Sequence, residues 1–286
     1  MEAHFGTDGQ SSSSLLSTLS SWGTNHKLSG ISYLALRFKW NQDVFGGIPT
    51  VQARIKGKKI VSYNSSLVAQ TPAYSTNPAF CLLDYLTNER YGKGLALSSL
   101  DLQSFYDASV ICETQVTPYS GASDINIFDC NAVIDTSKKV IDNVRELIKG
   151  MRAYLPYVQG KYRLNIETTG SASVSLTEDD IIGGYALASP SKNSKYNRVI
   201  CAFVNPEKNY QVDEIQYPQI DDSGYADADK HATMKSVDGG FLLEGRFDFR
   251  TITSPYQAEE MAEIILRRSR ESLGLNLNVG YKAYDI

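Results

Sequence analysis

One stretch of the chain, residues 77–94, constrains the fold more than any other because it carries the signals of a bounded helix. Asn77 can accept hydrogen bonds from the first free backbone amides, and Pro78 fits the first helical turn. Tyr91 and Gly92 are expected to end the helix, since glycine adopts positive φ without strain. Apolar residues between these ends share one face: Cys81, Leu82, Tyr85 and Leu86. The pattern predicts a helix packed against a core.

The chain has 286 residues, enough for one elaborated domain or for two to three compact ones. Its 28 basic and 32 acidic residues give a formal net charge of −4, which argues against a main task of holding nucleic acid. The N-terminus has no apolar signal-peptide core, and no run approaches about 18 uncharged apolar residues. We therefore expect a soluble chain that neither inserts into a membrane nor is secreted by its own signal.

Residues 1–27 are polar and serine-rich, and four apolar residues in them recur at helical spacing: Leu15, Leu16, Leu19 and Trp22. They predict either a short amphipathic helix or a partly ordered arm. Alternation predicts a strand from Ile31 to Phe38, and a hairpin in which Val51–Ile55 and Lys59–Tyr63 flank Lys56-Gly57-Lys58.

The middle of the chain predicts two further helices, one starting near Leu100-Asp101 and one capped near Thr136-Ser137. Strands are expected at 153–158 and 162–166, joined by the tight turn Gln159-Gly160-Lys161, and again at 171–176 and 198–204.

The last third begins with an acidic segment, residues 205–230, which is expected to form an extended solvated strand and loop. Ser254-Pro255 opens a final helix that Gly274 ends, and residues 275–284 form a closing strand. The predicted organisation is an N-terminal arm (1–27), the first part of a β domain (28–76), a helical insertion (77–123), a helix with β-strands (124–204), and an acidic segment with helix and strand (205–286).

Several of these segments occur in the same order in a known family. Residues 77–94 resemble the NPA…LLTxxRYGxG segment of the central hub and tip attachment proteins of long-tailed bacteriophages. Similar segments extend from Phe5 to Ile286 and include Gly6-Thr7-Asp8-Gly9-Gln10, Gly47-Ile48-Pro49, Tyr196-Asn197-Arg198-Val199 and Gln257-Ala258. The positions that we assign to the family motif are Asn77, Pro78, Leu83, Leu86, Arg90, Tyr91, Gly92, Gly160, Tyr162 and Asn197.

The resemblance implies an α+β fold of β-rich, barrel-like hub domains with an inserted helical segment and a C-terminal helix plus strand. It implies a homotrimeric ring at the distal end of the tail, synthesised in the host cytoplasm. The implied partners are the tail tube or distal tail protein, the tape-measure protein, and tail fibre or tip proteins. Many longer members continue beyond the position of Ile286, so we expect either a compact hub with separate adhesins or part of a larger polypeptide.

The residues themselves indicate no reactive centre, metal site or cofactor. The cysteines are too far apart for paired metal ligands, and we expect four reduced, buried thiols: Cys81, Cys112, Cys130 and Cys201. Cys81 and Cys112 lie on apolar faces of the predicted helices, where a raised pKa would make them inert. The histidines lack metal spacing and are expected in exposed loops: His4, His26 and His231. The acidic run 221–229 is expected to be a solvated loop, with Ca²⁺ binding as its alternative.

We therefore predict a structural virion protein that joins the tail tube end to tip or fibre components and gates genome passage, without sequence-specific binding of nucleic acid. Two alternatives stay open. The 18 tyrosines suit a carbohydrate-binding module that recognises the cell surface. A tail-associated cell-wall hydrolase would need two facing carboxylates, or a thiol beside a histidine, and the sequence singles out neither.

Overall fold

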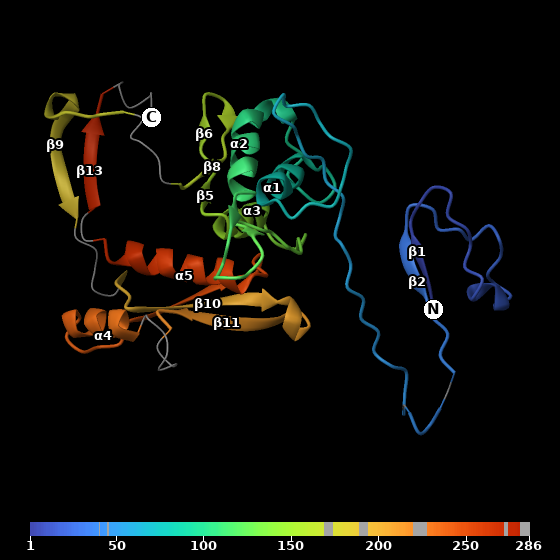
Figure 1. The fold of residues 1–286 in the computed structure, drawn as a ribbon. Helices are drawn as coiled ribbons and strands as arrows, with labels where there is room; N and C mark the ends of the chain where they lie inside the picture. Colours follow the sequence, from blue (N-terminus) through green and yellow to red (C-terminus); the bar gives the residue numbers. More distant parts are fainter. Residues whose placement is uncertain are drawn as a thin grey trace. The chain divides into compact units, whose positions relative to one another are not determined.

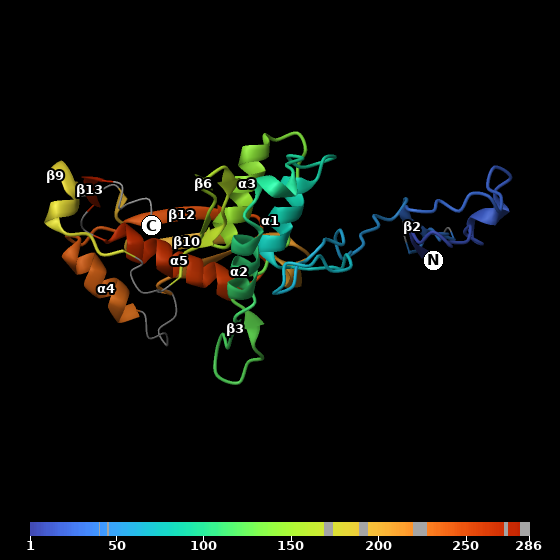
Figure 2. The ribbon, with the colours of Figure 1, turned by 90° about the horizontal axis from the view of Figure 1, so that it is seen from above.

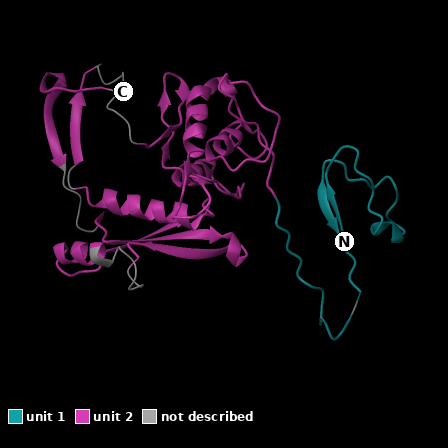
Figure 3. Cartoon of the chain, in the orientation of Figure 1, with its two compact units in different colours: residues 1–55 teal, residues 56–286 magenta. Residues whose placement is uncertain are grey.

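The computed structural model describes residues 1–39, 41–44, 46–168, 174–188, 194–219, 228–271 and 274–280. The chain divides into two compact units, residues 1–55 and residues 56–286 (Figure 3). The described helices are α1 (Pro78–Thr87), α2 (Leu102–Cys112), α3 (Val140–Gly150), α4 (Ala228–Val237) and α5 (Pro255–Ser269). The described strands are β1 (Glu2–Phe5), β2 (Ser32–Ala35), β3 (Gln115–Val116), β4 (Ile125–Asn126), β5 (Ala153–Tyr154), β6 (Tyr157–Val158), β7 (Lys161–Tyr162), β8 (Asn165–Ile166), β9 (Ile181–Ala188), β10 (Arg198–Asn205), β11 (Gln211–Tyr217), β12 (Glu244–Phe249) and β13 (Gly274–Val279).

The smaller unit is a loop that the antiparallel strands β1 and β2 close. The side chain of Gln10 lies buried inside this loop. Its Oε1 accepts a hydrogen bond from the amide of Gly6 at 2.7 Å, and its Nε2 donates to the carbonyl oxygens of Lys27 and Leu28 at 2.8 and 3.1 Å. One amide side chain therefore satisfies backbone groups on both sides of the loop.

The amphipathic helix predicted in residues 15–22 is wrong, because the structure has only a 3₁₀ turn there, Leu16–Thr18. The carboxylate of Glu2 accepts hydrogen bonds from the hydroxyl of Ser13 at 2.6 Å and from the amide of Ser14 at 3.0 Å. Such local bonds give the serine run an alternative to a helix. The serine hydroxyls also lower the pKa of Glu2 to about 2.

In the larger unit, α1, α2 and α3 enclose one hydrophobic core (Figure 1). Each helix contributes large side chains that are at most 2 % exposed, such as Leu82, Phe105 and Leu147. Strands β5 and β8 lie against α3 and α2. All three predicted helices are confirmed, although α3 begins at Val140, after Lys139, and not near Thr136-Ser137.

The hairpin predicted over residues 51–63 is wrong. Residues 51–59 form no strand, and Ile60 instead makes an antiparallel bridge with Ala73. The intervening turn is fixed by the side chain of Asn64, which accepts hydrogen bonds from two backbone amides at 3.0 Å. An asparagine side chain that mimics a backbone turn is a stronger local signal than the Lys-Gly-Lys sequence upstream.

A second core lies between α5 and a three-stranded sheet of order β11-β10-β12 (Figures 1 and 2). Strand β10 pairs antiparallel with β11 and parallel with β12. Alternate residues of β10, namely Val199, Cys201 and Phe203, are at most 2 % exposed, as are Ala258 and Ala262 of α5. The predicted strand at 198–204 and the final helix are confirmed.

Helix α5 begins as predicted, with the hydroxyl of Ser254 accepting a hydrogen bond from the amide of Gln257 at 3.5 Å. It ends at Ser269, earlier than predicted. Arg270 caps its C-terminal end, and Gly274 is the first residue of β13. Strand β13 pairs antiparallel with β9 to form a separate two-stranded ribbon.

The remaining predicted strands have mixed outcomes. The hairpin of β6 and β7 is confirmed, with positive φ at Gln159 and Gly160. Residues 174–176 are not a strand, whereas 171–173 and 281–284 lie outside the described residues. The acidic segment contains the predicted strand as β11, but a helix, α4, begins at Ala228.

The α+β class is confirmed, since helices and mainly antiparallel strands are both present. Over the residues that the structure describes, the strands form one three-stranded and five two-stranded sheets, and none of these closes into a barrel. Two or three strands are too few for a sheet to close on itself. The expectation of barrel-like hub domains is therefore corrected. The finer division at residues 27, 76, 123 and 204 stays a prediction.

Candidate functional site

The family motif closes the C-terminal end of α1. The helix ends at Thr87, and the chain then turns back so that the amide of Lys93 donates a hydrogen bond to the carbonyl of Tyr85 at 3.1 Å. The amide of Gly92 donates to the carbonyl of Asn88 at 3.2 Å. A Cβ atom at position 92 would lie 1.8 Å from the carbonyl oxygen of Tyr85. Gly92 is therefore needed for close backbone approach, whereas the positive φ expected there is found at Gly94.

Asn88 and Tyr91 brace this turn with their side chains. Asn88 Oδ1 accepts hydrogen bonds from the amides of Arg90 and Tyr91 at 2.9 and 3.2 Å. The hydroxyl of Tyr91 donates to the carboxylate of Asp84, and Lys58 Nζ lies 3.1 Å from the same carboxylate. The ammonium of Lys58 also lies 4.7 Å from the ring centroid of Tyr91. Lys58 thus ties the upstream segment to the end of α1.

The start of α1 is fixed in a similar way. Asn77 Oδ1 accepts a hydrogen bond from the amide of Ala79 at 3.1 Å, and Nδ2 donates to the carbonyl of Ser109 at 3.0 Å and to Glu113 Oε1 at 2.9 Å. Asn77 therefore both caps α1 and holds the end of α2. The motif residues Pro78, Leu83 and Leu86 are buried in the same core.

The motif residues Gly160 and Tyr162 lie in and beside the β6–β7 turn. Gly160 has φ +81°, which a residue with a Cβ rarely adopts. The ring of Tyr162 lies 4.9 Å from that of Tyr157, between ring centroids, and its carbonyl accepts a hydrogen bond from the amide of Asp101 at 2.9 Å. This turn is thus joined to the start of α2.

Asn197 is completely buried just before β10. Its Oδ1 accepts a hydrogen bond from the amide of Leu243 at 2.9 Å, and its Nδ2 donates to Asp238 Oδ2 at 3.0 Å. Asp238, whose side chain is 3 % exposed, also forms ion pairs with Arg270 at 2.8 Å and Lys195 at 3.1 Å. Arg270 in particular lowers the pKa of Asp238 to about 2. The network joins the ends of α4 and α5 to the sheet.

Gln257 of α5 bridges the two cores of the larger unit. It is 4 % exposed, its Nε2 donates to the carbonyl of Gly150 at 3.0 Å, and its Oε1 accepts from the amide of Asp129 at 3.2 Å. A Cβ atom on Gly150 would lie 2.6 Å from Thr251 Oγ1. The glycine that interrupts the end of α3 therefore permits close contact between the cores. The sequence pattern matched Gln257 to the family but did not indicate this role.

The four cysteines are free thiols, as predicted. Burial raises the pKa of Cys112 and of Cys201 to about 12. The raised pKa expected for Cys81 is wrong, because a hydrogen bond with Cys130 lowers the pKa of Cys81. The same bond and burial raise the pKa of Cys130.

Two of the three histidines correct the expectation of exposed loop positions. His4 lies on β1 and stacks on Tyr33 with 4.4 Å between ring centroids. His231 lies on α4 and is 8 % exposed, and burial lowers its pKa. His26 is exposed, as predicted, and its Nδ1 accepts a hydrogen bond from the amide of Gly23 at 2.8 Å.

Among the residues that the structure describes, no three His, Cys, Asp or Glu side chains gather into a group that could hold a metal ion. The acidic run 221–229 lies outside the described residues except for the start of α4. No described helix is both long and apolar enough to cross a membrane.

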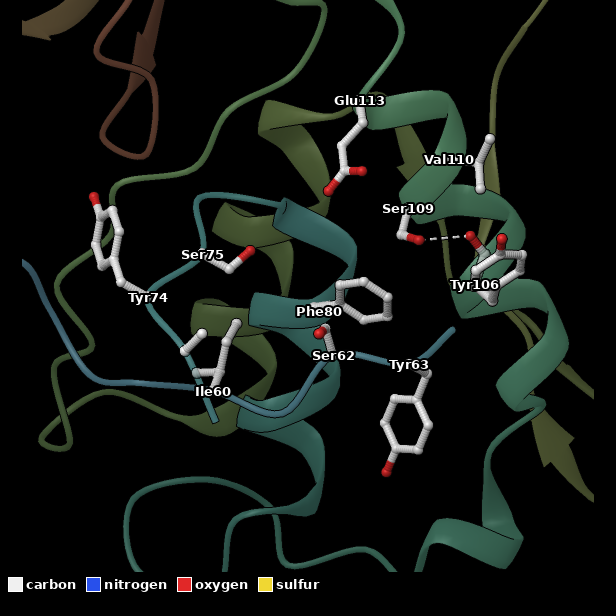
Figure 4. A pocket seen from close by; sticks show the side chains of 11 residues that line it. Ile60, Ser62, Tyr63, Tyr74, Ser75, Phe80, Tyr106, Ser109, Val110 and Glu113 are labelled. Carbon is white, nitrogen blue, oxygen red and sulfur yellow. Dashed lines mark hydrogen bonds between the residues drawn. The ribbon is translucent and has the colours of Figure 1, made fainter. Parts of the chain in front are cut away.

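A pocket of about 320 Å³ opens between the N-terminal end of α1 and the C-terminal end of α2 (Figure 4). The pocket is lined by segments that are distant in the sequence, and the sequence alone does not predict it. Its walls combine aromatic rings, hydroxyl groups and one carboxylate, and the lining residues are Ile60, Ser62, Tyr63, Ala73, Tyr74, Ser75, Phe80, Tyr106, Ser109, Val110 and Glu113.

The ribbon of β9 and β13 presents a second candidate surface. Leu275 pairs with Leu187, and Leu277 pairs with Tyr185, so these four side chains share one face by strand alternation. Tyr185, Leu187 and Leu275 are 65, 61 and 54 % exposed. In the regularly paired part of the ribbon, Ala186 and Asn276 occupy the alternate positions, while Ile182, beyond the irregularity in β9, is 63 % exposed. Neither strand contains a charged residue. The ribbon therefore presents uncharged, largely apolar side chains to solvent.

No family model matches the chain. It is 26 % identical over 280 residues to the baseplate hub protein pb3 of Escherichia phage T5, an alignment that covers 93 % of this chain and 28 % of pb3. It is 26 % identical over 145 residues to the tip attachment protein J of Escherichia phage SECphi27, covering 49 % of this chain and 12 % of that protein. A protein with the same name from Escherichia phage SECphi4 is 24 % identical over 192 residues, covering 60 % and 16 %.

The chain thus spans less than a third of the length of each of these relatives. The match to pb3 nevertheless covers both cores of the larger unit, because only a small part of the chain lies outside it. The predicted resemblance is confirmed, and the chain is related in sequence to the baseplate hub and tip attachment proteins of tailed phages.

Proposed function

We propose that the chain is a structural subunit of the distal hub of a phage tail, where it joins the end of the tail tube to tip or fibre components. The similarity to a baseplate hub protein over 93 % of the chain supports this role. On this proposal the chain works as a homotrimer, contacts the tail tube or distal tail protein and the tape-measure protein, and opens for genome passage.

The exposed apolar face of the β9–β13 ribbon is the observation that carries the proposal. An isolated two-stranded ribbon is at best marginally stable in water, and further strands or a covering surface are needed to stabilise it. Burial of one large apolar side chain contributes about 1.5–3 kcal/mol. Tyr185, Leu187 and Leu275 are each more than half exposed, so covering what remains exposed of them contributes about 3–5 kcal/mol per subunit.

A second copy of the chain is a suitable cover because the ribbon carries no charge and offers open strand edges. Uncharged surfaces can approach one another without desolvating ions. In a ring, each contact joins two different surfaces, so the open edge of β9 in one subunit would meet the open edge of β13 in the next, and repetition around an axis closes the ring. A shift of these contacts on host attachment would open the ring, and this is the mechanism that we propose for genome passage.

Two of the cysteines and the polar residues of the motif support a role in assembly. The thiols of Cys112 and Cys201 have a pKa of about 12 and are protonated at neutral pH. Polar residues at the motif positions, such as Asn77 and Asn197, are engaged with backbone groups of the fold.

Mass photometry of the purified chain, alone and mixed with the tube-end protein, tests the proposal. We expect a trimer of about 95 kDa from the 31.6-kDa chain in at least one condition. Leu187→Asp should shift the population to monomers, whereas Val133→Asp, at a 95 % exposed position away from the ribbon, should not. Monomers under both conditions, or equal assembly of both variants, would contradict the proposal.

A further inference from the structure

The residues that line the pocket between α1 and α2 favour a positively charged ligand. Its apolar side is aromatic, with Phe80 at 5 % exposure and Tyr63 at 6.4 Å from Phe80, between ring centroids. Tyr74 and Tyr106 contribute two further rings. Figure 4 shows Glu113 reaching from the end of α2 toward the side that Phe80 lines. Aromatic rings and a carboxylate both favour a cation.

None of the eleven described residues that line the pocket is basic. The carboxylate of Glu113 is held by its Oε1, which accepts the hydrogen bond from Asn77 Nδ2 at 2.9 Å. Because Asn77 is fixed in the cap of α1, this bond positions the carboxylate relative to the rings without neutralising its charge. An anion would meet repulsion in such a pocket, whereas an organic cation would not.

The aromatic rim already contacts a cation from within the chain. Lys56 Nζ lies 5.4 Å from the ring centroid of Tyr74, within the distance at which a ring attracts an ammonium group. Lys56 is not among the lining residues, so this contact leaves the interior open. The volume of about 320 Å³ lies at the lower end of the range for pockets that bind small ligands.

We propose that this pocket binds the guanidinium group of an arginine side chain that a neighbouring protein presents. A planar guanidinium stacks on aromatic faces and donates up to five hydrogen bonds. Glu113 and the hydroxyl oxygens of Ser62 and Ser75 are acceptors in the lining. That the arginine comes from a tail protein rests on the proposed function, but the affinity of the pocket for guanidinium does not.

Saturation-transfer NMR of the full chain with N-acetyl-arginine amide tests this inference, with N-acetyl-citrulline amide as the uncharged isostere. We expect a signal for arginine and a much weaker one for citrulline. Glu113→Gln should weaken arginine binding by up to about fivefold, the upper end of the range for an exposed ion pair, and it retains the acceptor for Asn77. Val110→Lys, which adds a cation at a 52 % exposed lining position, should abolish it.

Glu271→Gln, which removes an exposed carboxylate outside the pocket, is the matched control and should bind arginine as the unchanged chain does. Equal signals from arginine and citrulline, or arginine binding that survives both pocket variants, would overturn the inference. Trimers in mass photometry combined with no arginine binding would refute this inference and leave the hub proposal standing.

Discussion

Replacement of Gly92 by alanine tests whether the family motif builds the fold in the way that the structure shows. The added Cβ would lie 1.8 Å from the carbonyl oxygen of Tyr85 and 2.9 Å from that of Asn88. Contacts under 3.0 Å are essentially never observed for real Cβ atoms, so the backbone must retreat by more than an ångström. Both contacts are with backbone atoms, and no flexible side chain can yield.

The retreat breaks the hydrogen bonds that the amides of Gly92 and Lys93 donate to Asn88 and Tyr85. A typical hydrogen bond contributes about 0.5–1.5 kcal/mol, and a buried group left unpaired costs about 1–3 kcal/mol. We therefore expect Gly92→Ala to lower the free energy of unfolding by about 2–4 kcal/mol. This corresponds to a melting temperature lower by about 4–16 °C for a unit of this size.

Urea unfolding followed by circular dichroism at 222 nm measures this change, with Gly57→Ala as the control. Gly57 has nothing within 4 Å of its would-be Cβ and no positive φ. Its replacement should leave stability within about 0.5 kcal/mol of the original value or raise it slightly. A Gly92→Ala chain as stable as the control would refute the argument that close approach selects glycine here.

Three further results are expected. Gln257→Leu should lower the free energy of unfolding by about 2–4 kcal/mol in the same urea experiment, because the carbonyl of Gly150 and the amide of Asp129 lose their hydrogen-bond partner. An unchanged free energy would show that the two cores do not need this bridge. The pKa of Asp238 lies below its ordinary value of 3.8, so its stabilisation is complete above about pH 4 and is lost as the pH falls through about 2. The stability difference between the unchanged chain and Asp238→Asn should therefore shrink over that range, and a constant difference would contradict the ion pair. Iodoacetamide at neutral pH should alkylate Cys81 before Cys112 and Cys201, and peptide mass spectrometry can measure the order. Equal rates would contradict the pKa of about 12 that burial gives Cys112 and Cys201.

The starts of α1 and α5 could be predicted from the sequence because their signals are local, whereas α3 starts at Val140 and not at the cap predicted near Thr136-Ser137. Asn77-Pro78 and Ser254-Pro255 place a capping side chain directly before proline, and the structure uses both caps. The helix ends were less predictable. The sequence predicts positive φ at Gly92, but the role of this glycine depends on its distance to Tyr85, which follows only from the path of the returning chain.

Pairing between distant segments was the main part that the sequence could not provide. The alternation of residues 51–55 predicted a strand, yet Ile60 found its partner on the far side of the Asn64 turn. Buried polar residues such as Gln10 and Gln257 bind backbone groups of remote segments, and hydrophobic periodicity carries no signal for such contacts. The pocket at Glu113 is also assembled from segments that only the folded chain brings together.

The proposed place of this chain is the distal end of a phage tail. Gold labelling of an epitope tag on the chain, viewed by electron microscopy of whole particles, can show that place. We expect gold at the tail end opposite the capsid in most labelled particles. Label on the capsid, along the shaft, or only on material outside the particles would contradict it.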